Sequence, residues 1–102
     1  MAETALTEST YYILLSLYKP LHGYGIMQRA AELSGGRVRL AAGTLYGALN
    51  AMVDRGWIAL LPGEGRKKEY QLTPKGLGVL KNELERLREL VASGDMVMKE
   101  EA

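Results

Sequence analysis

The sequence predicts a mainly helical protein with one small β-hairpin, and three observations lead to this fold class. Apolar residues recur at helical spacing in four separate segments of the 102-residue chain. Residues 57–61 and 69–72 form two short apolar runs on either side of a Pro- and Gly-rich turn, which is typical of a hairpin. A hydrophobic fraction of 47% is sufficient for the core of a single domain.

The first helix is predicted over residues 7–19. Thr7 or Ser9 can cap its start, because a hydroxyl oxygen accepts a hydrogen bond from a free amide of the first turn. Apolar side chains occupy more than one face, so we expect one face to meet the core and the other to be available to a second subunit. Pro20 ends this helix, since the residue before a proline is forced out of the helical region. Residues 22–23 then form a turn.

The second helix is predicted over residues 24–33. Ile26, Ala30 and Leu33 stand at positions i, i+4 and i+7, which places them on one buried stripe. Residues 34–36, Ser-Gly-Gly, stop the helix because glycine accepts the left-handed conformation at a helix end. A brief extended segment or turn follows.

The third helix is predicted over residues 43–55, with Gly56 closing it. Its inner face consists of Leu45, Leu49, Met52 and Val53. Its outer face consists of Gly47, Asn50, Ala51 and Asp54. A helix that follows its predecessor after a short link predicts a helix-turn-helix, and the hairpin that comes next adds a wing. We place Tyr24, Trp57 and Tyr70 in the core.

The fourth helix begins at Pro74, with Thr73 as its cap. Its apolar residues alternate at spacings of three and four, which is typical of a coiled-coil seam and predicts dimerisation through Leu77, Leu80, Leu84, Leu87 and Val91. Residues 93–94, Ser-Gly, are expected to break the helix and leave 95–102 frayed. The chain thus divides into a winged helix-turn-helix at 1–73 and a C-terminal dimerisation helix with its tail at 74–102.

The charges are distributed unevenly, although the formal net charge is only +1. Between Arg37 and Lys68, six basic residues stand against two acidic ones, whereas residues 81–102 carry four basic and six acidic residues. The excess of basic residues in the middle of the chain predicts that this segment binds a polyanion. The alternative is a scatter of solvated charges, which composition alone leaves equally open.

Two groups of residues are candidates for contact with duplex DNA. A helix in the major groove needs small or hydrogen-bonding residues on its outer face, a requirement met by Thr44, Tyr46, Gly47 and Asn50. The basic hairpin tip and the segment before the third helix offer phosphate contacts through Arg66, Lys67, Lys68, Arg37 and Arg39. The alternatives are ordinary surface residues in the first group and lysines that protect a sheet edge from aggregation in the second.

Gly47 is the most informative of these residues, because glycine inside a helix is less favourable than alanine by ~1 kcal/mol. Close approach of DNA or of another backbone explains why it is tolerated, and so does neutral drift.

Several classes of function are not expected. The chain has no cysteine and one histidine, His22, so neither a thiolate zinc site nor a histidine-based triad can form. No nucleophile motif or phosphate-binding glycine loop is present, so we expect no enzyme, no cofactor and no metal. No apolar run reaches the ~20 residues of a membrane span, and residues 1–9 do not resemble a secretion signal. These features are consistent with a cytoplasmic location.

The chain resembles the PadR-like transcriptional regulators, specifically the short subclass without a separate C-terminal domain. The similarity covers roughly residues 11–90. It is carried by Gly-Tyr-Gly-Ile at 23–26, Gly-Thr-Leu-Tyr at 43–46, Ala-Leu at 48–49, Gly-Trp-Ile at 56–58 and Tyr-Gln-Leu-Thr-Pro-Lys-Gly at 70–76. The resemblance implies a homodimeric winged-helix repressor, with the last helix of one subunit against the first helix of the other. It also implies DNA contacts at Thr44 and Tyr46.

The sequence departs from that family at two places, because Ala42 and Gly47 stand where the family often has proline. Trp57 is the only tryptophan and lies outside the last helix, so the resemblance does not extend to the relatives that bind flat aromatic drugs there. A small-molecule effector that releases the repressor from its operator is a further expectation, without a named site.

Together these observations predict a homodimeric, sequence-specific DNA-binding repressor with a near-palindromic operator. The competing hypothesis is a winged-helix protein-interaction module that does not bind DNA.

Overall fold

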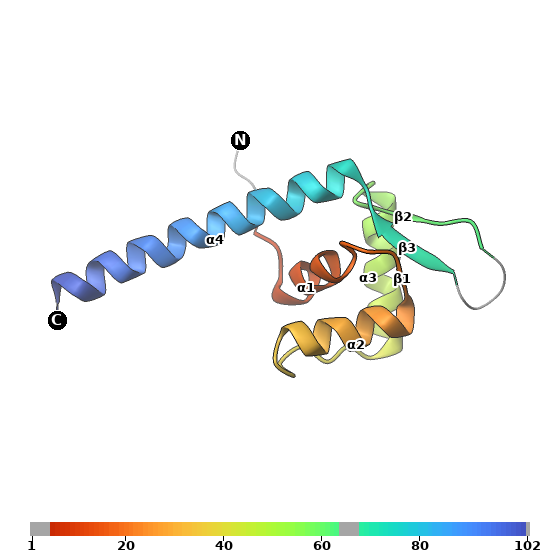
Figure 1. Cartoon of the computed structure of the whole chain (residues 1–102), viewed down its shortest axis with the longest axis horizontal. Helices are drawn as coiled ribbons and strands as arrows, with labels where there is room; N and C mark the ends of the chain where they lie inside the picture. The colour runs from red at the N-terminus through yellow and green to blue at the C-terminus, as the bar shows by residue number, and fades with distance from the viewer. Residues whose placement is uncertain (1–4, 64–67, 102) are drawn as a thin grey trace.

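The computed structural model describes residues 5–63 and 68–101, and Figure 1 shows how the elements are arranged. In chain order they are α1 (Glu8–Ser16), β1 (Leu21–His22), α2 (Gly23–Leu33), α3 (Ala42–Asp54), β2 (Ile58–Leu60), β3 (Glu69–Leu72) and α4 (Pro74–Glu100). The first three helices gather beside the small sheet, while α4 passes over them and continues well beyond. The predicted fold class, mainly helical with a small hairpin, is confirmed.

The core lies where α1, α2 and α3 meet strand β2 and the first turns of α4. Its buried side chains are Ile13, Leu14, Leu17, Ile26, Leu45, Leu49, Met52, Ile58 and Leu80. Trp57 and Tyr70 pack against this cluster, in agreement with their predicted place.

The core prediction was wrong for Tyr24, which is 63% exposed, and for Val53, which is 37% exposed. Tyr24 stands two positions before the buried Ile26, so its side chain leaves α2 on the opposite face. Val53 lies in the last turn of α3, at the margin of the apolar stripe.

The sheet is antiparallel with strand order β1-β3-β2. The predicted hairpin partners pair as expected, with Ile58 opposite Leu72 and Leu60 opposite Tyr70. The prediction of a turn at residues 22–23 was wrong, because Leu21 and His22 form β1 and pair with Tyr70 and Glu69. Two residues are too few to show the alternation of a strand, and the partner strand lies far along the chain.

The end of α3 is fixed to the start of α4 by Thr73. Its hydroxyl donates to the Gly56 carbonyl at 2.6 Å and accepts from the Gly76 amide at 3.0 Å, so the residue caps α4 as predicted. Gly56 ends α3 with φ at +77°, a conformation that glycine adopts without strain. A Cβ atom at Gly76 would overlap the Trp57 carbonyl, so only glycine permits this close approach.

Helix α4 is longer than predicted. It continues through Ser93 and Gly94 to Glu100 and comprises 27 residues, or ~40 Å. The Ser93 hydroxyl bonds back to the Leu90 carbonyl at 3.0 Å, so its hydrogen bond is made within the helix. One glycine weakens a helix by only ~1 kcal/mol, which flanking helix-forming residues offset. The expected break at 93–94 and the frayed tail from residue 95 are therefore wrong, although residue 102 lies outside the described residues.

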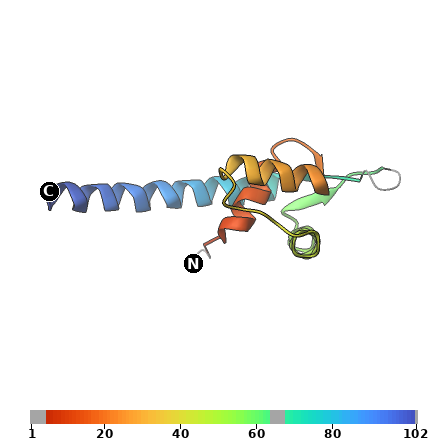
Figure 2. The same ribbon diagram turned by 90° about the horizontal axis from the view of Figure 1, so that it is seen from below.

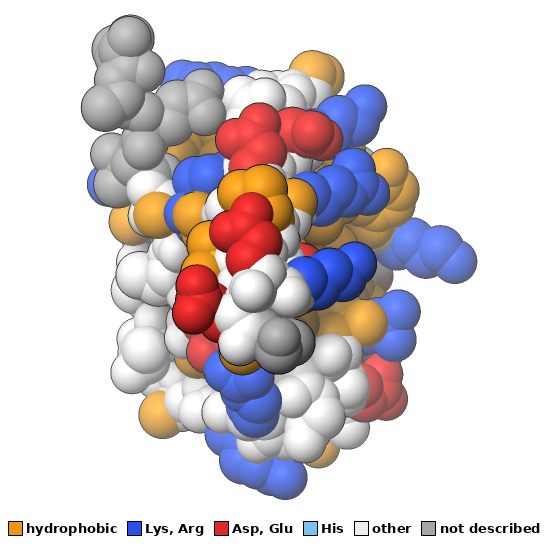
Figure 3. Space-filling view, turned by 90° about the vertical axis from the view of Figure 1, so that its left-hand side faces the viewer, with side chains coloured by type: hydrophobic (Ala, Val, Ile, Leu, Met, Phe, Trp, Pro, Cys, Tyr) orange, Lys and Arg blue, Asp and Glu red, His pale blue; other side chains and the backbone are white. Residues whose placement is uncertain are grey.

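The face of α4 that meets the core continues past the domain, and no described residue covers it there. Leu80 is 4% exposed and Glu83 6% exposed, whereas Val91 is 62% and Met98 75% exposed on the same side of the helix. Seen from the C-terminal end of α4, hydrophobic and acidic side chains lie next to each other (Figure 3). Of the predicted seam, Leu80 is part of this chain's own core, Leu77 and Leu87 are half-buried, and Leu84 is exposed.

Candidate nucleic-acid interface

Helix α3 has one buried and one open face, and the open face carries the predicted DNA-contacting residues. Leu45, Leu49 and Met52 are buried and hold the helix on the core. Thr44, Gly47 and Asn50 are exposed. Figure 2 shows α3 end-on at the margin of the molecule, where its outer side meets no other element of the described chain. The helix can therefore enter a groove without displacing any of those elements.

Two glycines of α3 have open space where a side chain would lie. A Cβ atom built on Gly43 or Gly47 would meet no described atom within 4 Å. Packing within this chain thus gives no reason for glycine at position 47. The sequence-based hypothesis of close approach to DNA is consistent with this open space.

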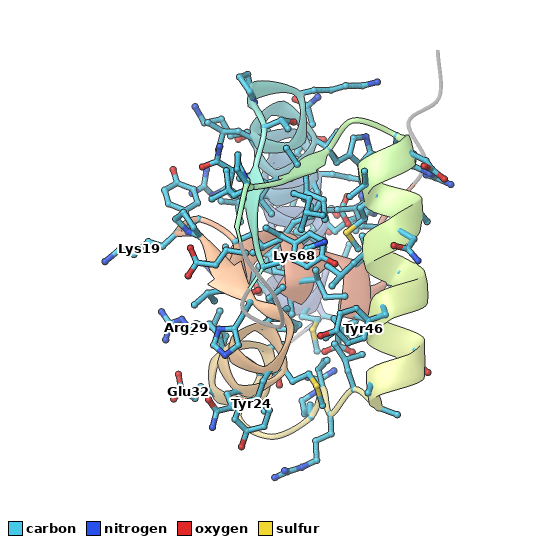
Figure 4. All side chains as sticks on the ribbon, turned by 90° about the vertical axis from the view of Figure 1, so that its right-hand side faces the viewer. Lys19, Tyr24, Arg29, Glu32, Tyr46 and Lys68 are labelled. Carbon is cyan, nitrogen blue, oxygen red and sulfur yellow. The ribbon has the colours of Figure 1, made fainter. Side chains whose placement is uncertain are left out.

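Tyr46 lies at the edge of this face and is 45% exposed. Its side chain points from α3 toward α2 (Figure 4) and contacts Gly23, the first residue of α2. The pKa of Tyr70 is raised, chiefly by burial and secondly by the neighbouring Tyr46. Tyr46 therefore lies against the first residue of α2 and near Tyr70 of β3.

The basic residues before α3 are both exposed but differ in their contacts. The Arg37 guanidinium pairs with the Glu8 carboxylate at 2.8 Å, which links this loop to the start of α1. Exposed ion pairs contribute only about 0–1 kcal/mol, so Arg37 can exchange this partner for a phosphate. The Arg39 guanidinium lies against Gly36, at the turn after α2.

The wing contributes Lys68, which is exposed just before β3 and faces the viewer in Figure 4. Arg66 and Lys67, the other two predicted wing contacts, lie outside the described residues. Antiparallel pairing of β2 with β3 brings Lys68 to the same end of the sheet as Leu61, where the hairpin projects from the domain.

Sequence reasoning missed a basic group at the C-terminal end of α3. The Arg55 guanidinium stacks over the Trp57 ring, with 5.0 Å from Cζ to the ring centroid. Stacking on an aromatic face holds the charge in a fixed direction at the base of the hairpin. The sequence signal for this contact is that Arg55 stands two residues before Trp57, at the start of the predicted strand.

Within residues 5–63 and 68–101, no three His, Asp, Glu or Cys side chains gather as a metal site would require. No helix in those ranges is long and apolar enough to cross a membrane. An open groove of ≈ 670 Å³ lies between α1 and α2, lined by Leu15, Tyr18, Lys19, Leu21, Arg29 and Leu33.

Known proteins that this chain resembles include a family of regulators and a relative encoded in a transposon. The sequence profile of the transcriptional regulator PadR-like family matches residues 12–82. An uncharacterized 37.1 kDa protein in a transposon of Streptomyces fradiae is 39% identical over 64 residues. Those residues are 63% of this chain but only 18% of that relative, so this chain spans less than a fifth of its length.

Among solved structures, a PadR family transcription regulator from Clostridium difficile is similar with a TM-score of 0.76 and 23% identity, covering 90% of this chain and 99% of the other. Bacillus subtilis PadR in complex with operator DNA is similar with a TM-score of 0.63 and 31% identity. That alignment covers 74% of this chain and 45% of the Bacillus protein.

Proposed function

The chain belongs to the PadR-like family of transcriptional regulators, and from this premise we propose that it is a sequence-specific DNA-binding repressor that acts as a homodimer. The observation that carries the proposal is the open face of α3. Thr44, Gly47 and Asn50 are exposed on a helix whose other face is fixed in the core.

The proposed contacts follow from the chemistry of the DNA grooves. Helix α3 enters the major groove, where the Asn50 amide can bond the N6 and N7 edge of an adenine and Thr44 can bond a base or a phosphate. Lys68 contacts phosphate or the minor groove together with its wing neighbours Arg66 and Lys67. Arg37 and Arg39 neutralise phosphates beside the start of α3. The similar Bacillus subtilis PadR, solved in complex with operator DNA, supports DNA binding by a protein of this fold.

The homodimer is proposed from the uncovered face of α4. A second copy would cover the exposed side chains on this face of its C-terminal half and remove apolar surface from water. In this arrangement residues 1–73 bind DNA and 74–102 join the subunits, with Leu84, Leu87 and Val91 in the seam and Leu80 supporting it from the core. Two-fold symmetry then requires a near-palindromic operator with half-sites ~34 Å apart.

Repression follows when the bound dimer occupies DNA that the transcription machinery requires. A small-molecule effector would relieve repression by changing the distance between the two α3 helices. The groove between α1 and α2 is open to such a molecule, and its lining combines leucines with the charged Lys19 and Arg29.

The test is a titration of the purified protein with the intergenic DNA beside its own gene, at two salt concentrations and with random duplex as competitor. We expect binding that is salt-sensitive, resists competitor and has the stoichiometry of a dimer, because phosphate contacts release counterions while base contacts select the sequence.

The rival function is a protein-interaction module. To separate the two, a random-sequence duplex library is selected with the same protein. Enrichment of a palindromic sequence would support the repressor even if its operator lies elsewhere in the genome. Without enrichment, and with equal affinity for every duplex, the proposed function would be rejected in favour of the module.

A further inference from the structure

The side chain of Tyr46 lies across the first residue of α2. A methyl group on Gly23 would overlap the Tyr46 hydroxyl and would lie 2.7 Å from Cζ of the ring. The backbone of Gly23 is buried. Glycine at this position therefore leaves the space that the ring occupies.

The same ring connects three parts of the fold. Tyr46 is in the first half of α3, and Gly23 follows β1 without an intervening residue. The pKa of Tyr70 in β3 is raised by burial and secondly by the nearby Tyr46 phenol. The backbone of Tyr70 is paired with Leu21 of β1. A change in the position of the ring would therefore change how α3 sits against α2 and the sheet.

We propose that Tyr46 is a positioning residue whose ring, seated on Gly23, sets the direction in which α3 is presented to DNA. This inference rests on the proposed DNA-binding function and assigns a role to Gly23, the first residue of the Gly-Tyr-Gly-Ile segment. Its physical basis is the narrow range of hydrogen-bond distances, since a shift of α3 by ~1 Å takes a side-chain amide out of reach of a base edge.

The experiment is a double-mutant cycle of Gly23→Ala and Tyr46→Ala. Affinity is measured for a duplex selected by the wild type from a random-sequence library, and for unselected random duplex. Gly23→Ala should weaken binding to the selected duplex on the order of 10-fold, because the added methyl displaces the ring. Binding to random duplex and its salt dependence should be retained, because these depend on phosphate contacts.

The second substitution distinguishes positioning from a direct contact. Once Tyr46→Ala has removed the ring, Gly23→Ala should cause little further loss, so the two effects are strongly non-additive. Tyr46→Phe keeps the ring and should lose clearly less affinity than Tyr46→Ala. Gly78→Ala is the matched control with wild-type binding, because it adds a methyl on α4 where no described atom lies within 4 Å.

All variants are compared at a temperature where circular dichroism shows them folded. Additive losses, equal losses on selected and random duplex, or a Tyr46→Phe variant as weak as Tyr46→Ala would each overturn the positioning role. If Gly23→Ala does not fold, a Tyr46→Phe variant as weak as Tyr46→Ala would still overturn the positioning role. If wild type selects no duplex, the proposed function fails and this role with it, while the cycle in urea unfolding still measures the contact itself.

Discussion

At the scale of single residues, Gly47 is a site where stability and binding should respond in opposite directions. No described atom lies within 4 Å of a Cβ built there, so an alanine fits without strain. Gly47→Ala should raise the free energy of unfolding by ~1 kcal/mol, because alanine is the better helix former. The same methyl should weaken operator binding by ~10-fold if DNA approaches the backbone of α3 at this point.

Urea unfolding and duplex titration measure the two effects of Gly47→Ala. Gly78→Ala, on the exposed side of α4, is the control and should gain similar stability with unchanged binding. A Gly47→Ala protein that binds as tightly as wild type would show that DNA does not come close at this position.

The contribution of the wing to DNA binding can be tested by substitution of Lys68. Replacing it with alanine should weaken binding to all duplexes and reduce the slope of log K against log salt by ~1, because one phosphate contact is lost. Lys81→Ala removes an exposed charge of the same kind from α4 and should leave the slope unchanged. Titrations at four or more salt concentrations give both slopes. Equal slopes for wild type and Lys68→Ala would remove Lys68 from the interface.

Glu83 should make the stability of the fold depend on pH in the acidic range. Its carboxylate accepts two 2.7 Å hydrogen bonds from Arg86 and one of 3.3 Å from the Leu6 amide. These hydrogen bonds, those of Arg86 first, lower the pKa of Glu83 against the opposing effect of burial.

Because the folded-state pKa of Glu83 lies below the unfolded one, the unfolded chain binds more protons between the two values. The stabilisation is therefore complete above the ordinary glutamate pKa of about 4.3 and is lost as pH falls through the lowered value. Glu83→Gln should lower Tm at pH 7 by ~5 °C and flatten its dependence on pH below 5.

Thermal unfolding from pH 3 to 7 measures the effect of Glu83→Gln. The matched control is Glu85→Gln, whose partner Arg88 is exposed and 3.5 Å away, so its curve should follow wild type. Identical curves for Glu83→Gln and wild type would show that the pair of Glu83 and Arg86 contributes nothing to acid sensitivity.

At the scale of elements, α4 has two functions along one face. Its first turns complete the core through Leu80, and its C-terminal half presents the same face to solvent. Val91→Glu should convert the proposed dimer to a monomer, since a charge buried in an apolar seam is strongly unfavourable. The fold of each subunit should persist, because this side chain makes no core contact in the single chain.

Sedimentation measures the oligomeric state of Val91→Glu, and circular dichroism measures its fold. Met96→Glu is the control, because Met96 is also exposed but lies five residues, or ~140°, around the helix from Val91. A dimeric Val91→Glu protein, or a monomeric Met96→Glu protein, would move the interface to another surface.

At the scale of the whole molecule, the long helix determines the shape. The chain extends 57 Å along its longest axis and 20 Å along its shortest, mainly because α4 continues past the winged domain. In the proposed dimer the DNA-binding helices are held at a fixed separation. Inserting 5 base pairs between the two half-sites rotates one by half a turn, and affinity should fall by ~100-fold.

Gel-shift titration against operators with inserts of different length checks this spacing rule. A single half-site serves as the reference for binding by one subunit. Affinity that does not depend on the insert would mean that the subunits bind independently and that no rigid dimer forms.

The sequence by itself determined the elements whose signals are local. Helix ends are indicated by the cap Thr73, by Pro74 and by the backbone conformation of Gly56. These signals do not depend on residues that are distant in the sequence. The spacing of Leu45, Leu49 and Met52 was enough to identify the buried face of α3, and hence the open face that carries Thr44 and Asn50. For the same reason the family was recognisable from short motifs.

Only the tertiary structure decided the features that depend on contacts between distant residues. Strand β1 exists because β3 pairs with it, and Leu80 belongs to the chain's own core because α4 crosses α1. Helix α4 continues through Gly94 because the helix preferences of the neighbouring residues together outweigh the cost of one glycine. The Ser-Gly pair considered alone does not show this sum. The contact between Tyr46 and Gly23 joins α3 to α2. The spacing of apolar residues within one helix does not show how that helix packs against another.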